Sequence, residues 1–190
     1  MPAHRELTIR DYRPEDEQSW LRCRVLAFLD TCYYDDVKPV RTPGNDIELV
    51  ALRDGDVIGI LDIEIDGELA TIDTVAVHPD HRGAGIATAL LELARRRLPD
   101  TVTTLDAWTR EDPAALAWYS ARGFAQSEHY LHVHKGHDEA GEGWTAPEPL
   151  SIPVMAFAHA RREHEAELRE RFARVYVCRR FSRPCLTAGR

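Results

Sequence analysis

The chain contains no run of apolar residues long enough to cross a membrane, and residues 1–6 hold no apolar segment of the secretory type. Basic residues are not in excess, because 24 lysines and arginines are outnumbered by 32 aspartates and glutamates, which gives a net charge of −8. Proteins that bind nucleic acid usually present a basic surface. We therefore expect a cytoplasmic protein with neither a membrane nor a nucleic-acid partner.

The sequence also lacks the usual patterns of metal ligands and disulfides. Its four cysteines form no C-x-x-C pair and are Cys23, Cys32, Cys178 and Cys185. Free thiols in a reducing compartment are expected. Four histidines lie between residues 129 and 137, but no cysteine pair or H-E-x-x-H helix accompanies them. No metal site is predicted.

The 190 residues, 44% of them hydrophobic, are enough for one globular domain over residues 1–190. Alternating and continuous apolar patterns predict strands over residues 7–12, 47–53, 57–65, 69–77, 102–107, 124–135 and 174–179. Helical patterns predict helices over residues 14–30, 85–99, 114–122 and 159–171. Residues 32–43 read as a loop or a short second helix. The strands of residues 47–77 are joined by short turns, so this part of the sheet should be antiparallel.

Residues 75–91 are the most informative segment, because they combine a buried strand, a polar turn, a glycine-rich loop and the start of an amphipathic helix. Gly83 and Gly85 allow backbone amides to approach a ligand without an intervening side chain. The unpaired N–H groups and the positive end of the helix dipole favour a phosphate. The alternative is that the two glycines only make a tight turn from strand to helix.

The loop from Arg82 to Ala87 matches the pattern R/Q-x-x-G-x-G/A of the GNAT superfamily of N-acetyltransferases. A second segment, Ala117 to Phe124, resembles another signature of that family, a helix with a tyrosine four residues before Gly-Phe. Residues 9–16 resemble the family's first strand and helix start. The resemblance covers about residues 7–135 and the final strand.

The resemblance implies an α/β fold, with a mixed, mostly antiparallel central sheet flanked by helices. In this family the sheet splays beside the strand before the glycine loop, and acetyl-CoA enters the gap. Backbone groups of Val75, Ala76 and Val77 would then contact the pantetheine arm. The expected pyrophosphate site is Arg82, Gly83, Ala84, Gly85, Ile86, Ala87 and Thr88, with Arg82 adding charge-assisted contacts.

The resemblance also suggests catalytic residues. Tyr119 would protonate the departing thiolate, although its ring could equally pack in the core. Asp73 precedes the loop on the same strand and could take the proton of the amine, directly or through water, but it could also be a solvated aspartate. A backbone N–H near Val75 or Val77 could polarise the acetyl carbonyl.

Two further features concern the acceptor. Asp62, Glu64 and Asp66 alternate with apolar residues, which predicts one acidic strand face. We expect a solvent face, the alternative being attraction of a cationic amine. Residues 136–171 form an insert between the last two predicted strands, where the family usually has a short turn. The insert could cover the acceptor site, with Trp144 as a lid rather than a core residue, or it could serve as a homodimer element or a packing appendage.

The resulting hypothesis is direct transfer of an acetyl group from acetyl-CoA to a primary amine on a small molecule or peptide. A non-catalytic acyl-CoA-binding module is the alternative. A dinucleotide-dependent oxidoreductase is a third reading, because Gly83-x-Gly85-x-x-Thr88 nearly matches the dinucleotide fingerprint. Five residues separate that pattern from the preceding strand, and the antiparallel strands argue against a doubly wound sheet.

Overall fold

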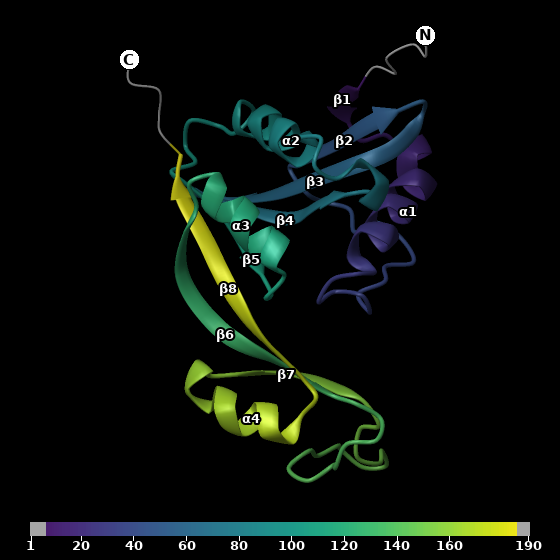
Figure 1. The fold of residues 1–190 in the computed structure, drawn as a ribbon, viewed down its shortest axis with the longest axis vertical. Helices are drawn as coiled ribbons and strands as arrows, with labels where there is room; N and C mark the ends of the chain where they lie inside the picture. The colour runs from purple at the N-terminus through teal and green to yellow at the C-terminus, as the bar shows by residue number, and fades with distance from the viewer. Residues whose placement is uncertain (1–6, 186–190) are drawn as a thin grey trace. The chain divides into compact units, whose positions relative to one another are not determined.

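The computed structural model describes residues 7–185, which divide into two compact units. The first contains residues 7–107 and 182–185, and the second residues 108–181. The first unit is built from β1 (Thr8–Asp11), α1 (Glu17–Phe28), β2 (Ile47–Arg53), β3 (Asp56–Asp66), β4 (Leu69–Val77), α2 (Ile86–Arg95) and most of β5 (Thr104–Thr109). Its strands lie in the order β1-β2-β3-β4-β5 (Figure 1). Strands β1 to β4 are antiparallel and β5 is parallel to β4.

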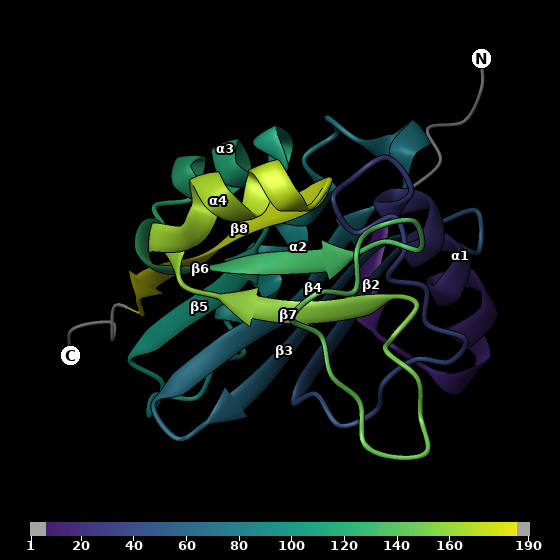
Figure 2. The same ribbon diagram turned by 90° about the horizontal axis from the view of Figure 1, so that it is seen from below.

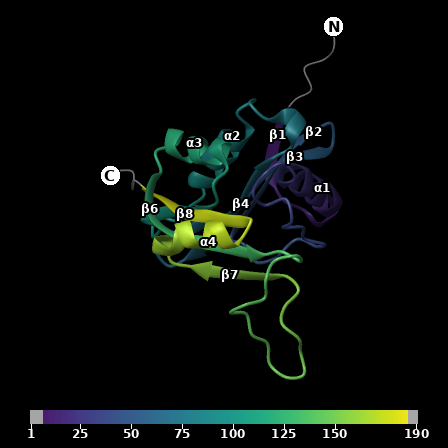
Figure 3. The same cartoon turned by 60° about the horizontal axis from the view of Figure 1, so that its bottom comes forward.

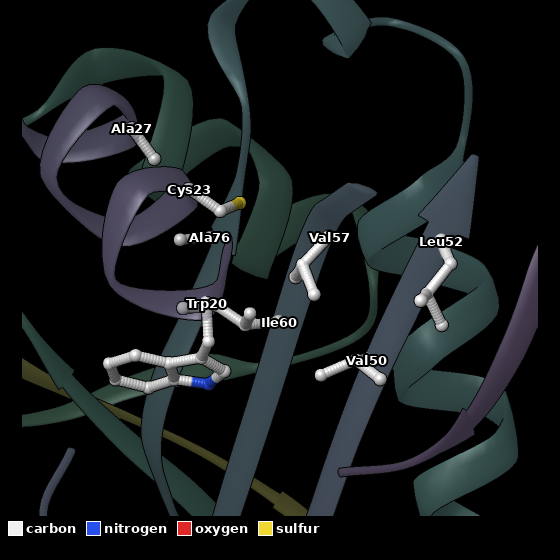
Figure 4. Packing of buried hydrophobic residues seen from close by; sticks show 8 residues of the cluster. All are labelled: Trp20, Cys23, Ala27, Val50, Leu52, Val57, Ile60 and Ala76. Atoms are coloured by element: carbon white, nitrogen blue, oxygen red, sulfur yellow. The ribbon is translucent and has the colours of Figure 1, made fainter. Parts of the chain in front are cut away.

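Helices α1 and α2 cover opposite faces of this sheet. Trp20 and Cys23 of α1 pack in one buried cluster with Val50 and Ile60, which face each other across β2 and β3 (Figure 4). Gly59, which directly precedes Ile60 in β3, faces α2. A Cβ added to Gly59 would lie 2.6 Å from a methyl carbon of Ile86, so only glycine lets α2 pack this closely.

The second unit holds α3 (Pro113–Ala121), β6 (Ala125–Lys135), β7 (Ala156–Ala160), α4 (Glu165–Arg171) and most of β8 (Arg174–Pro184). Its strands lie in the order β8-β6-β7, and β6 and β7 run side by side in opposite directions (Figure 2). Helix α3 begins directly after Asp112 and is followed by Gly123 at φ +78°, close to the predicted helix over residues 114–122. The α/β fold with a mostly antiparallel sheet flanked by helices is thus confirmed.

Residues 32–43 form a loop of turns and bends, the first of the two conformations predicted for them. One local prediction needs correction. The insert of residues 136–171 was predicted as a loop followed by a helix from His159, but it contains strand β7, and α4 begins only at Glu165. Three of the five residues of β7 are alanines, so the segment carries little strand propensity of its own. Pairing with β6 fixes its conformation.

The prediction that Trp144 is a lid residue rather than a core residue is contradicted by its packing. The long connection between β6 and β7 projects beyond the two strands (Figure 3). Trp144, in this connection, nevertheless packs against the core cluster of Leu131, Val133, Phe172, Val175 and Val177. Its ring meets Phe172 edge-on, with centroids 6.3 Å apart. The indole therefore anchors the connection to the core of the second unit.

Replacing Trp144 by alanine is expected to destabilise the protein by about 2 kcal/mol, because it removes a large, half-buried aromatic side chain from this cluster. Chemical denaturation measures the change. Leu150→Ala is the matched control, since Leu150 lies in the same connection and is 66% exposed. Equal stability of the two variants would show that Trp144 contributes nothing to the core.

Candidate active site

Strands β4 and β5 pair only along the first half of β4. They pair in parallel from Leu69 opposite Thr104 to Ile72 opposite Ala107, and in the described chain this pairing does not continue beyond Ile72. Thr71 donates a hydrogen bond to Asp106 across the paired half, at 2.6 Å. The remainder of β4, residues 73–77, is paired with β3 alone. In the described chain, no strand is paired with residues 73–77 along the edge of β4 that faces away from β3, which is the kind of edge that strand addition uses.

The glycine loop that follows β4 leads directly into helix α2. Gly83 and Gly85 both have φ +76°, and a Cβ added at either would meet no atom within 4 Å. The left-handed backbone at Gly85 begins the helix, whose first internal hydrogen bond runs from the N–H of Ala89 to the carbonyl of Gly85. The N–H groups of Ile86 and Ala87 thus have no carbonyl within the helix to bind. The loop has the open, amide-lined form that an anion requires.

The side chain of Arg82 is held by the end of helix α1. Its guanidinium forms a two-pronged ion pair with Asp30, with N–O distances of 2.7 and 2.9 Å, and donates to the carbonyl of Ala27 at 2.7 Å. The pair lowers the pKa of the Asp30 carboxyl. Arg82 therefore fixes the glycine loop against α1. Direct contact of its guanidinium with a phosphate remains a prediction.

Strand β4 contains a bulge at Asp73. Thr74 lies opposite Asp62 of β3, and Ile72 lies opposite Ile63, so Asp73 is the extra residue between them. Its exposed carboxylate accepts a hydrogen bond from the Thr74 hydroxyl at 3.0 Å. Bulges of this kind re-aim a side chain and are common beside active sites. The bulge lies where β4 separates from β5, next to Val75 and Val77.

Asp62 is buried, contrary to the prediction that Asp62, Glu64 and Asp66 form one solvent face. Glu64 and Asp66 are exposed, but only 2% of Asp62 is accessible. Desolvation raises the pKa of the Asp62 carboxyl to about 7, assisted by the negative charges of Glu48 and Asp73 and opposed by Arg41 and Lys38. Asp62 is thus the carboxyl with the raised pKa beside the bulge. The alternation of residues along β3 did not distinguish it from Glu64 and Asp66.

The raised pKa of Asp62 predicts a pH-dependent stability difference. The folded protein binds the proton on Asp62 more tightly than the unfolded chain does. Protonation of Asp62 therefore contributes fully to the free energy of unfolding below about pH 4, and this contribution is lost as the pH rises through about 7. The free energy of unfolding of Asp62→Asn, relative to that of the parent protein, should therefore rise by about 2 to 3 kcal/mol from pH 5 to pH 8. Denaturant unfolding at both pH values measures it, with Glu64→Gln as the exposed control. A difference that does not vary with pH would show that Asp62 titrates normally.

Tyr119 belongs to α3 in the second unit and is 5% exposed. Its ring stacks on Phe181, with centroids 5.5 Å apart and planes 22° from parallel. Phe124, the last residue of the signature Tyr-x-x-x-Gly-Phe, meets the same ring edge-on at 5.3 Å. The signature therefore holds the tyrosine ring in a fixed aromatic setting. The role of its hydroxyl stays a prediction.

The structure brings Val75, Ala76, Val77, the loop of residues 82–88 and Asp73 together in the first unit. Three of the four cysteines are poor nucleophiles, because burial raises the pKa of Cys23 to about 12 and also raises the pKa values of Cys178 and Cys185. Within residues 7–185, no three His, Cys, Asp or Glu side chains are grouped for a metal ion. No helix in that range is both long enough and apolar enough to span a membrane.

Comparison with known proteins identifies the family and the fold. The model of the acetyltransferase (GNAT) family matches residues 5–124. The ribosomal-protein-S18-alanine N-acetyltransferase of Escherichia coli superposes with a TM-score of 0.60 at 17% identity, over 97% of both chains. An N-acetyltransferase of Staphylococcus aureus Mu50 gives 0.60 at 13% identity, over 95% of this chain and 99% of that one. The PaiA N-acetyltransferase of Thermoplasma acidophilum, solved with coenzyme A, gives 0.55 at 13% identity, over 64% and 91%.

Proposed function

Since the chain belongs to the GNAT family of acetyltransferases, we propose that it transfers an acetyl group from acetyl-CoA directly to a primary amine. The observation that carries this proposal is the separation of β4 from β5 immediately before an open glycine loop at a helix start. A strand edge and an anion site in succession fit a ligand that has an amide-containing arm followed by phosphates. Acetyl-CoA has that order of groups.

The cosubstrate is proposed to bind through backbone groups. Val75, Ala76 and Val77 would pair with the amides of the pantetheine arm, in the manner of an added strand. The pyrophosphate would lie on the N–H groups of the loop, Gly83, Ala84, Gly85, Ile86, Ala87 and Thr88, with Arg82 holding the loop in position. The open space at both glycines and the ion pair of Arg82 with Asp30 support this arrangement.

The chemical step is proposed to be attack of the neutral amine on the thioester carbonyl. A backbone N–H near Val75 or Val77 would stabilise the negative charge that develops on the carbonyl oxygen. Asp73, exposed at the bulge, would attract the ammonium form of the acceptor, whose proton must leave before the nitrogen can attack. Tyr119 would give a proton to the departing thiolate. The family signature around Tyr119 and its fixed ring support that assignment.

The second candidate is an acyl-CoA-binding module without catalysis, which the burial of Tyr119 favours. A thiol-release assay separates the two. The probes are acetyl-CoA with an alkylamine, an amino acid, a polyamine and a peptide with a free amino terminus. The enzyme hypothesis predicts release of coenzyme A that depends on one class of amine. Binding of acetyl-CoA without amine-dependent release from any of them would favour the module.

A further inference from the structure

One row of side chains crosses β2, β3 and β4 on the face covered by α1. Glu48 lies opposite Asp62, and Asp62 lies opposite Thr74. Two carboxylates at this point already have partners, because Glu48 pairs with Arg41 and Asp73 accepts from Thr74. Asp62, between them, is buried, and its Oδ1 has no hydrogen-bond partner in the part of the chain that the structure describes. An unpaired buried carboxylate oxygen is costly unless something else binds it.

A second buried polar atom near this row is also unsatisfied. Trp20 of α1 is 1% exposed, and its Nε1 has no hydrogen-bond partner within residues 7–185. Trp20 packs with Ile60 and Ala76, which form the neighbouring row of β3 and β4 on the same face. In Figure 4 its indole lies past Ile60, on the side away from Val57. A donor and an acceptor thus lie unsatisfied in adjacent rows on this face, and each could be satisfied by a water or a polar ligand group.

On the basis of the proposed acetyl transfer, we propose that Asp62 is the group that finally takes the proton of the acceptor ammonium, directly or through one water. The N–H bond of the ammonium breaks and its electron pair stays on nitrogen, while a new O–H bond forms on Asp62. The neutral amine attacks the thioester carbonyl, so that a C–N bond forms and the C–S bond breaks. The departing thiolate takes a proton from Tyr119, and the second proton that the nitrogen loses restores the Tyr119 hydroxyl through water. Asp62 then returns its proton to water.

The environments of the two aspartates explain why Asp62, and not Asp73, is assigned this step. Asp73 is exposed and hydrated, which suits it to attract a cation. Asp62 is desolvated, and its pKa of about 7 matches a base that works near neutral pH. The charged groups that act on it are Lys38 and Arg41 from the segment after α1, Glu48 from β2 and Asp73 from β4. The side chains of α1 in the cluster on this face, Trp20, Cys23 and Ala27, are neutral near pH 7.

The test is the pH dependence of kcat/KM for Asp62→Asn, using the best amine of the panel and saturating acetyl-CoA. The parent protein should lose activity as the pH falls through about 7. Asp62→Asn should be about 10²-fold slower at pH 7, should bind acetyl-CoA normally and should no longer show this loss near pH 7. Its deficit should shrink at high pH, where the amine is already neutral, which a purely structural defect would not do. Glu64→Gln, two residues along β3, should behave like the parent protein.

Normal turnover by Asp62→Asn, or an unchanged pH profile, would overturn the assignment of Asp62 while leaving acetyl transfer intact. If Asp62→Asn does not fold, Asp62→Glu replaces it. That variant keeps a carboxylate, so it must still lose activity at low pH. An Asp62→Glu variant whose activity does not fall at low pH would overturn the assignment. A parent protein that binds acetyl-CoA but acetylates no amine would overturn the proposed function, and the role of Asp62 with it.

Discussion

Replacing Gly85 by glutamate should abolish the stabilisation of the protein by acetyl-CoA. At a hundredfold excess over its dissociation constant, acetyl-CoA is expected to raise the free energy of unfolding of the parent protein by about 2.7 kcal/mol. The new carboxylate would lie where the pyrophosphate is expected, so repulsion and steric overlap act together. Thermal or denaturant unfolding with and without acetyl-CoA measures the effect.

The left-handed backbone at Gly85 makes a control necessary. Any side chain at φ +76° is strained, at a cost of about 1–2 kcal/mol that has no connection with ligand binding. Gly67→Glu is the matched control, because Gly67 has φ +59°, faces open space and lies in the turn at the opposite end of β4. Both variants should lose intrinsic stability, but only Gly85→Glu should lose the response to acetyl-CoA. An undiminished response would remove the loop from the binding site.

Replacing Tyr119 by phenylalanine should lower kcat by about 10²-fold or more, because the leaving thiolate loses its proton donor. The affinity for acetyl-CoA should change little, since the ring and its stacking on Phe181 remain. Steady-state kinetics at saturating amine, with acetyl-CoA binding measured separately, give both quantities.

Phe124→Leu serves as the comparison for Tyr119→Phe, because it perturbs the aromatic setting of Tyr119 while leaving the hydroxyl in place. It should lower stability more than turnover. If Tyr119→Phe turns over normally, the residue is a packing residue and another group protonates the thiolate.

The sequence predicted most of the first unit because its local signals agree with one another. Short turns such as Asp54-Gly55 fix the antiparallel order of β2, β3 and β4, and Gly83 and Gly85 mark the start of α2. Local patterns carry less information about which strands pair with each other. Strand β7 was missed because its conformation depends on pairing with β6 and not on its own residues.

The burial of Asp62 shows a second limit. Alternation predicts which side chains share a strand face, but it does not say how far a helix covers that face. Helix α1 and the segment after it cover Asp62 and leave Glu64 and Asp66 in solvent. Arg82 is a second example. The family resemblance suggested a phosphate as its ligand, but no sequence pattern indicated its ion pair with Asp30, which lies 52 residues earlier in the chain. Neither fact can be read from neighbouring residues.

The most direct test of the account is a single turnover with acetyl-CoA that carries an isotopically labelled acetyl group, analysed by mass spectrometry with protein in excess. Direct transfer predicts that the label appears on the amine, in an amount equal to the coenzyme A released, while the mass of the protein stays unchanged throughout. Labelled protein that forms before labelled amine would contradict direct attack. Acetyl-CoA that remains bound and intact in the presence of every amine would contradict the assignment of the chain as an acetyltransferase.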